Sequence, residues 1–258
     1  MSGPPSRPAL ITALALASAL SVVASALIGY APITLGETLA AFAGGASEPV
    51  RLVVWEIRLP RALTAFLVGA ALGASGALLQ GLLRNPLADP GVLGVSASAA
   101  LGAVVALYFN LALISAFAVP VMAVLFALAA TAILYIAGAA RLSAVQLVLV
   151  GVGLSSFAGA LTALAMNLSP NPFSLSDMVN WLLGSVANRS YADIGFGAPF
   201  WIAGAVLAAL ALPGLRALAL GEDTAATLGA DLGRTRLLVI AGSALMTGAA
   251  VAVAGTIG

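Results

Sequence analysis

The stretch that decides the fold is residues 92–140, VLGVSASAALGAVVALYFNLALISAFAVPVMAVLFALAATAILYIAGAA, which contains no charged residue. A bilayer core about 30 Å thick is crossed by roughly 20 apolar residues, so this stretch is long enough for two crossings. It lacks the alternation of polar and apolar residues that marks a membrane barrel strand, which favours helices. We expect spans at 93–108 and 117–139, with a turn within 110–120.

The rest of the chain repeats this character in both directions. Hydrophobic residues make up 62% of the sequence and charged residues only 7%, against about 25% charged in an ordinary soluble domain. Further spans are expected at 9–30, 62–83, 142–168, 194–215 and from 237 to the end. The predicted fold class is therefore all-α: a polytopic transmembrane helical bundle with about seven spans.

The first apolar stretch and the segment after it each leave two interpretations open. A cleavable secretory signal is the alternative for 9–30, with 24–26 as its small-residue site, although the length of the run and the later spans favour a retained helix. Residues 31–56 are rich in Gly and Pro and carry charges, so they form an interfacial or aqueous loop, with a short amphipathic piece at 34–42.

Missing residue types exclude several functions. The chain has no Cys and no His, and all ten basic residues are Arg. Thiolate and imidazole metal ligands, Ser-His triads and the lysine-containing phosphate loop are therefore impossible within it. We expect no catalytic residue, no metal site and no cofactor. If ATP drives this protein, a separate subunit must bind the nucleotide.

Three motifs stand out against this apolar background. The first runs from Arg58-Leu59-Pro60-Arg61 through the charge-free 62–83, which contains Gln80, to Arg84-Asn85-Pro86-Leu87-Ala88-Asp89-Pro90-Gly91 and on to Ser96. The second is Trp181-Leu182-Leu183-Gly184-Ser185, and the third is the charged, glycine-bounded segment 220–229. A polar, two-proline break next to a membrane span is tolerated where protein or a water-filled path covers it.

These motifs closely resemble the FecCD-like permease subunits of the iron-siderophore, haem and cobalamin ABC importers. The resemblance covers nearly the whole chain. It implies the type II importer permease fold with ten helices, so that 1–258 is a single permease domain expected to lack its last three helices. It also implies that 216–236 is the cytoplasmic segment that couples to the ATPase.

The function implied by the resemblance is import of a bulky metal chelate (ferric siderophore, haem or cobalamin) from periplasm to cytoplasm by alternating access. The implied partners are a second copy of the permease, two ATPase subunits, a periplasmic substrate-binding protein, the chelate and membrane lipid, with no nucleic acid. The expected location is the bacterial inner membrane. Ferric siderophore is favoured only because it is the broadest class in the group.

The resemblance also assigns roles to particular residues. The predicted sites are binding-protein docking by Arg58 and Arg61, a cytoplasmic gate at Asn85 and Leu87, and ATPase coupling by Leu220, Gly221, Glu222, Asp223, Ala226, Leu228 and Gly229. Simpler interpretations stay open for each: arginines that snorkel to the interface, a loop between helices, and a solvated loop.

Two other functional classes remain as alternatives. An ion-coupled carrier usually places ionisable residues within the membrane, and the expected spans hold none. A passive channel would need a selectivity filter, and no filter motif is visible. Small residues recur at helical spacing, as Gly69 with Gly73 and as Gly94, Ser98 and Gly102. Such faces allow close helix packing within the subunit, at a dimer seam or along a pore.

Overall fold

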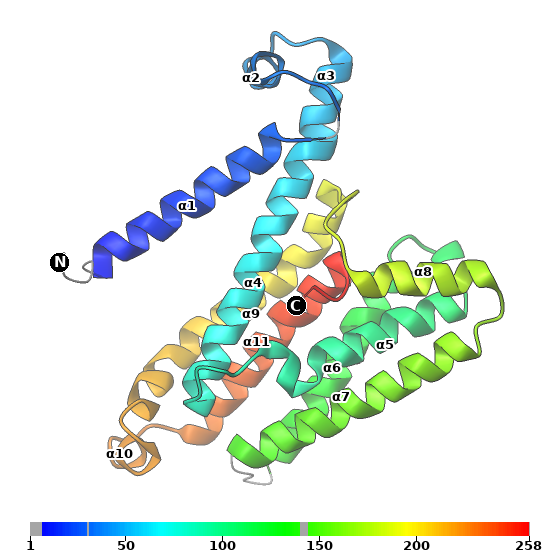
Figure 1. The fold of residues 1–258 in the computed structure, drawn as a ribbon. Coiled ribbons are helices and arrows are strands. Elements are labelled where there is room, and N and C mark those ends of the chain that lie inside the picture. The colour runs from blue at the N-terminus through cyan, green and yellow to red at the C-terminus, as the bar shows by residue number, and fades with distance from the viewer. Residues whose placement is uncertain (1–6, 30, 140–143, 258) are drawn as a thin grey trace. The chain divides into compact units, whose positions relative to one another are not determined.

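The computed structural model describes residues 7–29, 31–139 and 144–257, and these form helices and their connections without a strand. In chain order the elements are α1 (Arg7–Leu27), α2 (Leu35–Ala43), α3 (Glu48–Leu52), the π-helix η1 (Val53–Arg58), α4 (Leu59–Leu83), the 3₁₀ helix η2 (Pro90–Leu93), α5 (Val95–Tyr108), the 3₁₀ helix η3 (Leu111–Leu113), α6 (Ala118–Ala139), α7 (Ala144–Asn167), α8 (Pro172–Leu183), α9 (Tyr191–Leu218), α10 (Glu222–Thr227) and α11 (Leu232–Ala254). Figure 1 shows this course. The all-α fold predicted from the sequence is confirmed.

Six helical stretches of the described chain are long and apolar enough to cross a membrane: Pro8–Leu27, Glu48–Leu83, Ala118–Ala137, Gln146–Asn167, Tyr191–Leu218 and Leu232–Ala254. The remaining expected span, 93–108, forms α5, which has 14 residues and is therefore only about 21 Å long. Gly94, with φ 76°, ends η2 immediately before α5, so the residues before it cannot lengthen that helix. The first residues of the expected span 142–168 lie outside the described part.

The chain forms two compact units: Met1–Val68 with Val186–Ile194, and Gly69–Ser185 with Gly195–Gly258. The larger unit is built around α5 and α11. In it α5 packs against α6, α7 and α11, and α11 also packs against α6. From Val239 to Ala254 most side chains of α11 are buried, although the helix has no polar face to contrast with an apolar one.

Small residues explain how these apolar helices bind one another without a hydrophobic driving force in lipid. A Cβ on Gly102 of α5 would clash with the Met122 carbonyl oxygen of α6, and a Cβ on Gly248 of α11 would lie 2.8 Å from the Ala127 Cβ. Backbones therefore approach closely across the α5–α6 and α11–α6 contacts. A Cβ on Gly69 or Gly73 of α4 meets no atom of the described residues within 4 Å.

Candidate functional site

The smaller unit places both predicted docking arginines against the end of α1. Arg58 donates from Nη1 to the Leu27 carbonyl (2.7 Å) and from Nη2 to the Ala31 carbonyl (2.9 Å). Arg61 donates from Nη2 to the carbonyls of Ser25 (3.1 Å) and Ile28 (2.8 Å). The last four carbonyls of a helix lack partners inside it and carry partial negative charge, so two guanidinium groups cap this end.

The two arginines differ in exposure. Arg58 is 2% exposed, while Arg61 is only half-buried. Arg58 packs so closely on Gly29 that a Cβ there would lie 2.7 Å from the arginine Nε. Docking by either arginine is not tested by this geometry and stays a prediction. The burial does mean that Arg61 can meet an outside carboxylate more readily than Arg58.

The predicted gate residues lie in the break between α4 and α5, within the larger unit. The Asn85 Oδ1 accepts a hydrogen bond from the backbone N–H of Leu87 (2.9 Å), which closes a local turn. The Asp89 carboxylate accepts from the backbone N–H of Gly91 (2.7 Å) and so caps η2. Leu87 is 85% exposed. Asn85 therefore shapes the turn that presents Leu87 outward, and the gate itself stays a prediction.

Helix α7 packs closely against η2, at the end of the same break. A Cβ on Gly151 would clash with the Val92 carbonyl oxygen, and a Cβ on Gly94 would lie 2.8 Å from the Gly151 carbonyl oxygen. One turn later the Ser155 hydroxyl donates to the Gly91 carbonyl (3.4 Å). Sequence reasoning missed this contact, although the Gly151 and Ser155 pair at i, i+4 spacing was a signal that could have located it.

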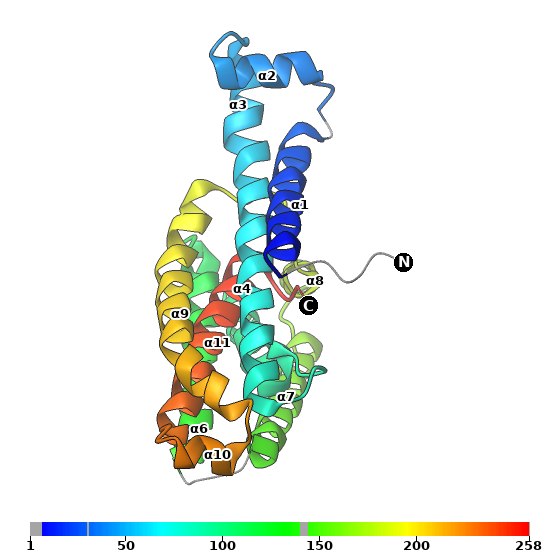
Figure 2. The ribbon, with the colours of Figure 1, turned by 90° about the vertical axis from the view of Figure 1, so that its left-hand side faces the viewer.

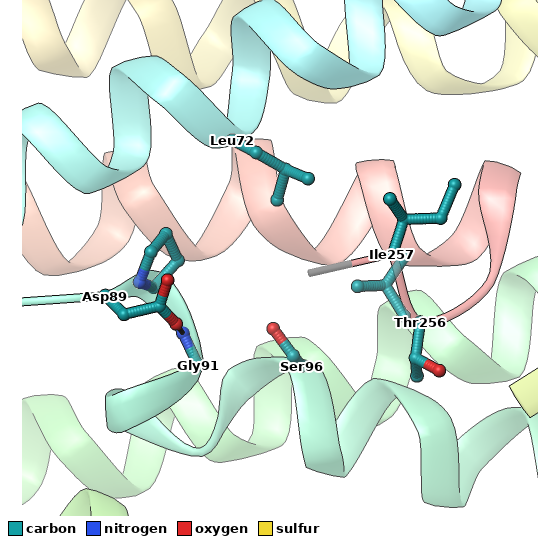
Figure 3. A pocket seen from close by; sticks show the side chains of 8 residues that line it. Leu72, Asp89, Gly91, Ser96, Thr256 and Ile257 are labelled. Atoms are coloured by element: carbon teal, nitrogen blue, oxygen red, sulfur yellow. Dashed lines mark hydrogen bonds between the residues drawn. The ribbon is translucent and has the colours of Figure 1, made fainter. Parts of the chain in front are cut away.

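A cavity of about 420 Å³ lies beside this break. Its lining comprises Leu72, Asp89, Pro90, Gly91, Ser96, Val251, Thr256 and Ile257. Figure 3 shows the Asp89 carboxylate and the Ser96 hydroxyl on the rim of the same space, with Leu72 across from them. The cavity therefore joins the break to the C-terminal end of α11 through a mostly apolar wall.

The second motif also meets that end of α11. The Ser185 N–H donates to the Ala254 carbonyl (2.6 Å), and the Thr256 hydroxyl donates to the Leu182 carbonyl. Gly255 has φ 77°, and a Cβ on it would clash with the Trp181 carbonyl oxygen. The Trp181–Ser185 motif is thus a backbone seat for residues 254–256, which the sequence alone did not reveal.

The predicted coupling residues surround the short helix α10. Gly221 (φ 106°) precedes it and Gly229 (φ 79°) follows it, so both ends turn through conformations that favour glycine. Ala225 is buried and holds the helix in place, whereas Leu220 and Leu228 are 63% and 64% exposed. Asp223, Ala226 and Gly229 are exposed as well.

An ion pair ties α10 to the start of α11. Arg236 Nη2 lies 3.1 Å from Glu222 Oε1, and the Arg236 side chain is only 18% exposed. Asp231 caps α11 by accepting from the Arg234 N–H (2.9 Å). The segment thus has a fixed shape with two apolar side chains, Leu220 and Leu228, projecting from it. Its role in ATPase coupling stays a prediction.

The sequence is similar to a known family of transport proteins. The profile of the FecCD transport family matches residues 16–258. The vitamin B12 import system permease protein BtuC of Vibrio cholerae is 42% identical over 209 residues, which cover 80% of this chain and 62% of that protein. The ferric enterobactin transport system permease protein FepD of Escherichia coli is 37% identical, over 97% of this chain and 74% of FepD. The molybdate import system permease protein MolB of Haemophilus influenzae is 33% identical, over 99% and 77%.

A solved structure described as an inward-facing, metal-chelate type ABC transporter matches with a TM-score of 0.83 and 30% identity. The match covers 97% of this chain and 77% of that one. The expected location, a multi-pass protein of the bacterial inner membrane, is confirmed by these relatives together with the six apolar helices. The matched stretch spans 62% of the length of the vitamin B12 permease. With its motifs, its helical architecture and a family match over nearly its whole length in agreement, the chain belongs to the FecCD transport family.

Proposed function

We propose that the chain is the membrane-spanning permease part of an ATP-binding-cassette importer that moves a bulky metal chelate from periplasm to cytoplasm by alternating access. The observation that carries the proposal is the agreement of fold and sequence with a metal-chelate transporter over 97% of the chain. The short helix α10, with the exposed side chains of Leu220 and Leu228 on either side of it, supports it further, because a helix laid into a groove is a common way for one protein to bind another.

The proposed assembly contains a second copy of the permease, two ATPase subunits and a periplasmic substrate-binding protein, surrounded by lipid. The sequence supports a separate ATPase because a chain without Lys cannot form the lysine-containing phosphate loop. The coupling segment is proposed to contact the ATPase through Leu220, Gly221, Glu222, Asp223, Ala226, Leu228 and Gly229. Asn85 and Leu87 are proposed as the gate, since the turn that Asn85 closes leaves Leu87 exposed.

Ferric siderophore, haem and cobalamin are the proposed substrate classes. Relatives are named for vitamin B12, for ferric enterobactin and for molybdate, which differ widely in size and charge. We favour a ferric siderophore, the broadest class of the group. The chain has no His to bind haem iron, but Arg side chains could pair with haem propionates.

Transport in proteoliposomes of the complete assembly tests the proposal. Uptake of cobalamin, ferric siderophore, haem and molybdate would each be measured with the binding protein and ATP. One chelate is expected to accumulate only when ATP is hydrolysed, and ionophores that collapse proton and sodium gradients are expected to have no effect. Uptake that continues without ATP and stops with an ionophore would instead establish an ion-coupled carrier.

The two arginines are expected to respond differently to substitution. Arg58→Met removes two charge-assisted hydrogen bonds to partly buried carbonyls, each worth about 1.5–3 kcal/mol, so the thermal stability of the permease in detergent should fall. Arg61→Glu also loses two hydrogen bonds to carbonyls at the end of α1, but it reverses the charge on the more exposed arginine, so it should in addition weaken binding-protein affinity and flatten its salt dependence. Unchanged affinity and salt dependence in Arg61→Glu would contradict a docking role for Arg61.

A further inference from the structure

An apolar stripe on α2, in the smaller unit, is exposed along its length, and the ring contact of Phe42 with Trp55 lies at its C-terminal end. Leu35, Leu39 and Phe42 are 59%, 56% and 44% exposed, and their i, i+4, i+7 spacing places them on one side of the helix. Glu37 lies about 160° around the helix from Leu39 at 100° per residue. The short helix therefore has an apolar side and a charged side, both of them exposed.

Both ends of α2 are capped. A capping box with Thr34 and Glu37 begins it, and Gly44 (φ 81°) ends it. Two hydrogen bonds from Thr34 lower the pKa of Glu37, and the bond from the Thr34 side chain contributes more than the bond from its backbone. The Glu37 carboxylate therefore stays ionised at neutral pH, and the contribution of the cap is lost only as the pH falls through this lowered value.

Trp55 of η1 fixes the position of α2 along the axis of η1. The Trp55 Nε1–H donates to the Ala41 carbonyl (3.2 Å), and the Trp55 and Phe42 rings meet edge-on with centroids 5.5 Å apart. Figure 2 shows α2 lying crosswise to α3, the helix that leads into η1. Both the level and the orientation of α2 are therefore set by contacts within this unit.

That level can be compared with the edge of the bilayer. The apolar span of α1 ends at Leu27, and Arg58 is hydrogen-bonded to the Leu27 carbonyl. Trp55 lies three residues before Arg58, which is about 4.5 Å along a helix axis. The interfacial layer on each side of the hydrocarbon core is about 5 to 7 Å thick. The contact between α2 and Trp55 therefore falls inside the interfacial layer and not in bulk water.

We propose that α2 is an interfacial membrane anchor, with Leu35, Leu39 and Phe42 inserted among lipids of the leaflet at the C-terminal end of α1. Apolar side chains on one side of a helix that lies in the membrane plane, with charges on the other, are the pattern of such anchors. Trp55 adds an indole at the depth that Trp favours in membrane proteins. The inference depends on the chain spanning a membrane and not on what it transports.

The charges near α2 indicate whether its insertion needs anionic lipid. Between residues 34 and 57 the acidic side chains are Glu37, Glu48 and Glu56 and the one basic side chain is Arg51. The next two bases, Arg58 and Arg61, donate hydrogen bonds to carbonyls at the end of α1. A shallow cavity of about 300 Å³ beside Trp55 is lined by Arg51, Leu52, Trp55 and Glu56. The segment around α2 has no excess of positive charge to attract anionic lipid, so insertion must come from the apolar stripe and should proceed equally in zwitterionic membranes.

Site-directed spin labelling tests the anchor. Residues 1–258 contain no cysteine, so Leu39→Cys gives one defined label in this stretch. The matched control is Ala40→Cys, a half-buried position about 100° further round α2, on the side of Glu37. Both variants would be reconstituted in zwitterionic vesicles, and label collisions with oxygen, which concentrates in lipid, would be compared with those of a water-soluble nickel chelate.

The label at Leu39 is expected to favour oxygen over the nickel chelate several-fold, and the label at Ala40 is expected to favour nickel. Neither ratio should change with salt or with added anionic lipid. A nickel-accessible label at Leu39 would overturn the proposal, and so would a lipid signal that appears only with anionic lipid. If the Leu39 label is aqueous but becomes protected when the binding protein is added, the stripe is a protein-docking surface and not a lipid anchor.

Discussion

Gly229→Pro is expected to abolish the stimulation of ATP hydrolysis by substrate in the assembled transporter, while the membrane helices stay folded. Gly229 has φ 79°, and proline fixes φ near about −65°. Proline also removes the N–H that donates to the Ala226 carbonyl (3.0 Å) at the end of α10. The turn between α10 and α11 must therefore change course, which moves the exposed Leu228.

The effect should be large because coupling depends on shape. A loss of about 1.4 kcal/mol of binding free energy weakens the binding of a helix to its partner tenfold. A forced change of backbone direction is expected to cost more than that. Gly229→Asn is the matched control, since Asn adopts positive φ more readily than other side chains. A Cβ at this position meets no atom of the described residues within 4 Å. An assembly with the Asn variant should therefore show the same substrate-stimulated ATPase activity as the native assembly.

The measurement is substrate-stimulated ATPase activity of the reconstituted assembly, together with its size-exclusion profile. Loss of stimulation in the proline variant, with retention in the asparagine variant and an unchanged profile, is the expected result. Full stimulation in Gly229→Pro would contradict the assignment of this segment to ATPase coupling, because its shape could not then matter.

The transmembrane character of the chain could be predicted because it depends on composition. Residues 92–140 carry no charge, and the two helices expected there form as α5 and α6. Helix ends were less predictable. The connection between the last two expected spans was placed at 216–236, whereas α9 continues to Leu218 and α11 already begins at Leu232. Arg234 and Arg236 lie in the first two turns of α11, near its N-terminal end, where charged residues are tolerated.

Candidate site residues could be chosen from the sequence, but their contacts could not be predicted from it. The motif indicated that Arg58 matters, yet its burial against the Leu27 carbonyl depends on where α1 ends in space. The contacts of Gly151 and Ser155 with residues 91–93 join segments about sixty residues apart in the sequence, and no local sequence pattern predicts such a contact. Periodicity identifies helices, whereas the partners of a buried polar group follow from tertiary packing.

Gly102→Ala is expected to reduce the stability of the permease sharply, although it adds a single methyl group. The Cβ would clash with the Met122 carbonyl oxygen and lie 2.9 Å from the Phe126 Cβ. The obstacle is helix backbone, which cannot rotate aside like the end of a side chain, so α5 and α6 must separate. Overpacking of this kind costs about 1–3 kcal/mol, and Gly102→Val should cost more because it adds two further methyl groups.

Gly73→Ala in α4 is the matched control, because the same methyl group there meets no atom of the described residues within 4 Å. It should be neutral or stabilising by up to about 1 kcal/mol, since alanine favours a helix over glycine. Thermal stability in detergent, followed by fluorescence-detected size-exclusion chromatography, orders the variants. The expected order is Gly73→Ala at or above the native protein, then Gly102→Ala, then Gly102→Val. A Gly102→Val variant as stable as the native protein would contradict the close approach of the α5 and α6 backbones. The larger unit could then not be packed tightly around α5.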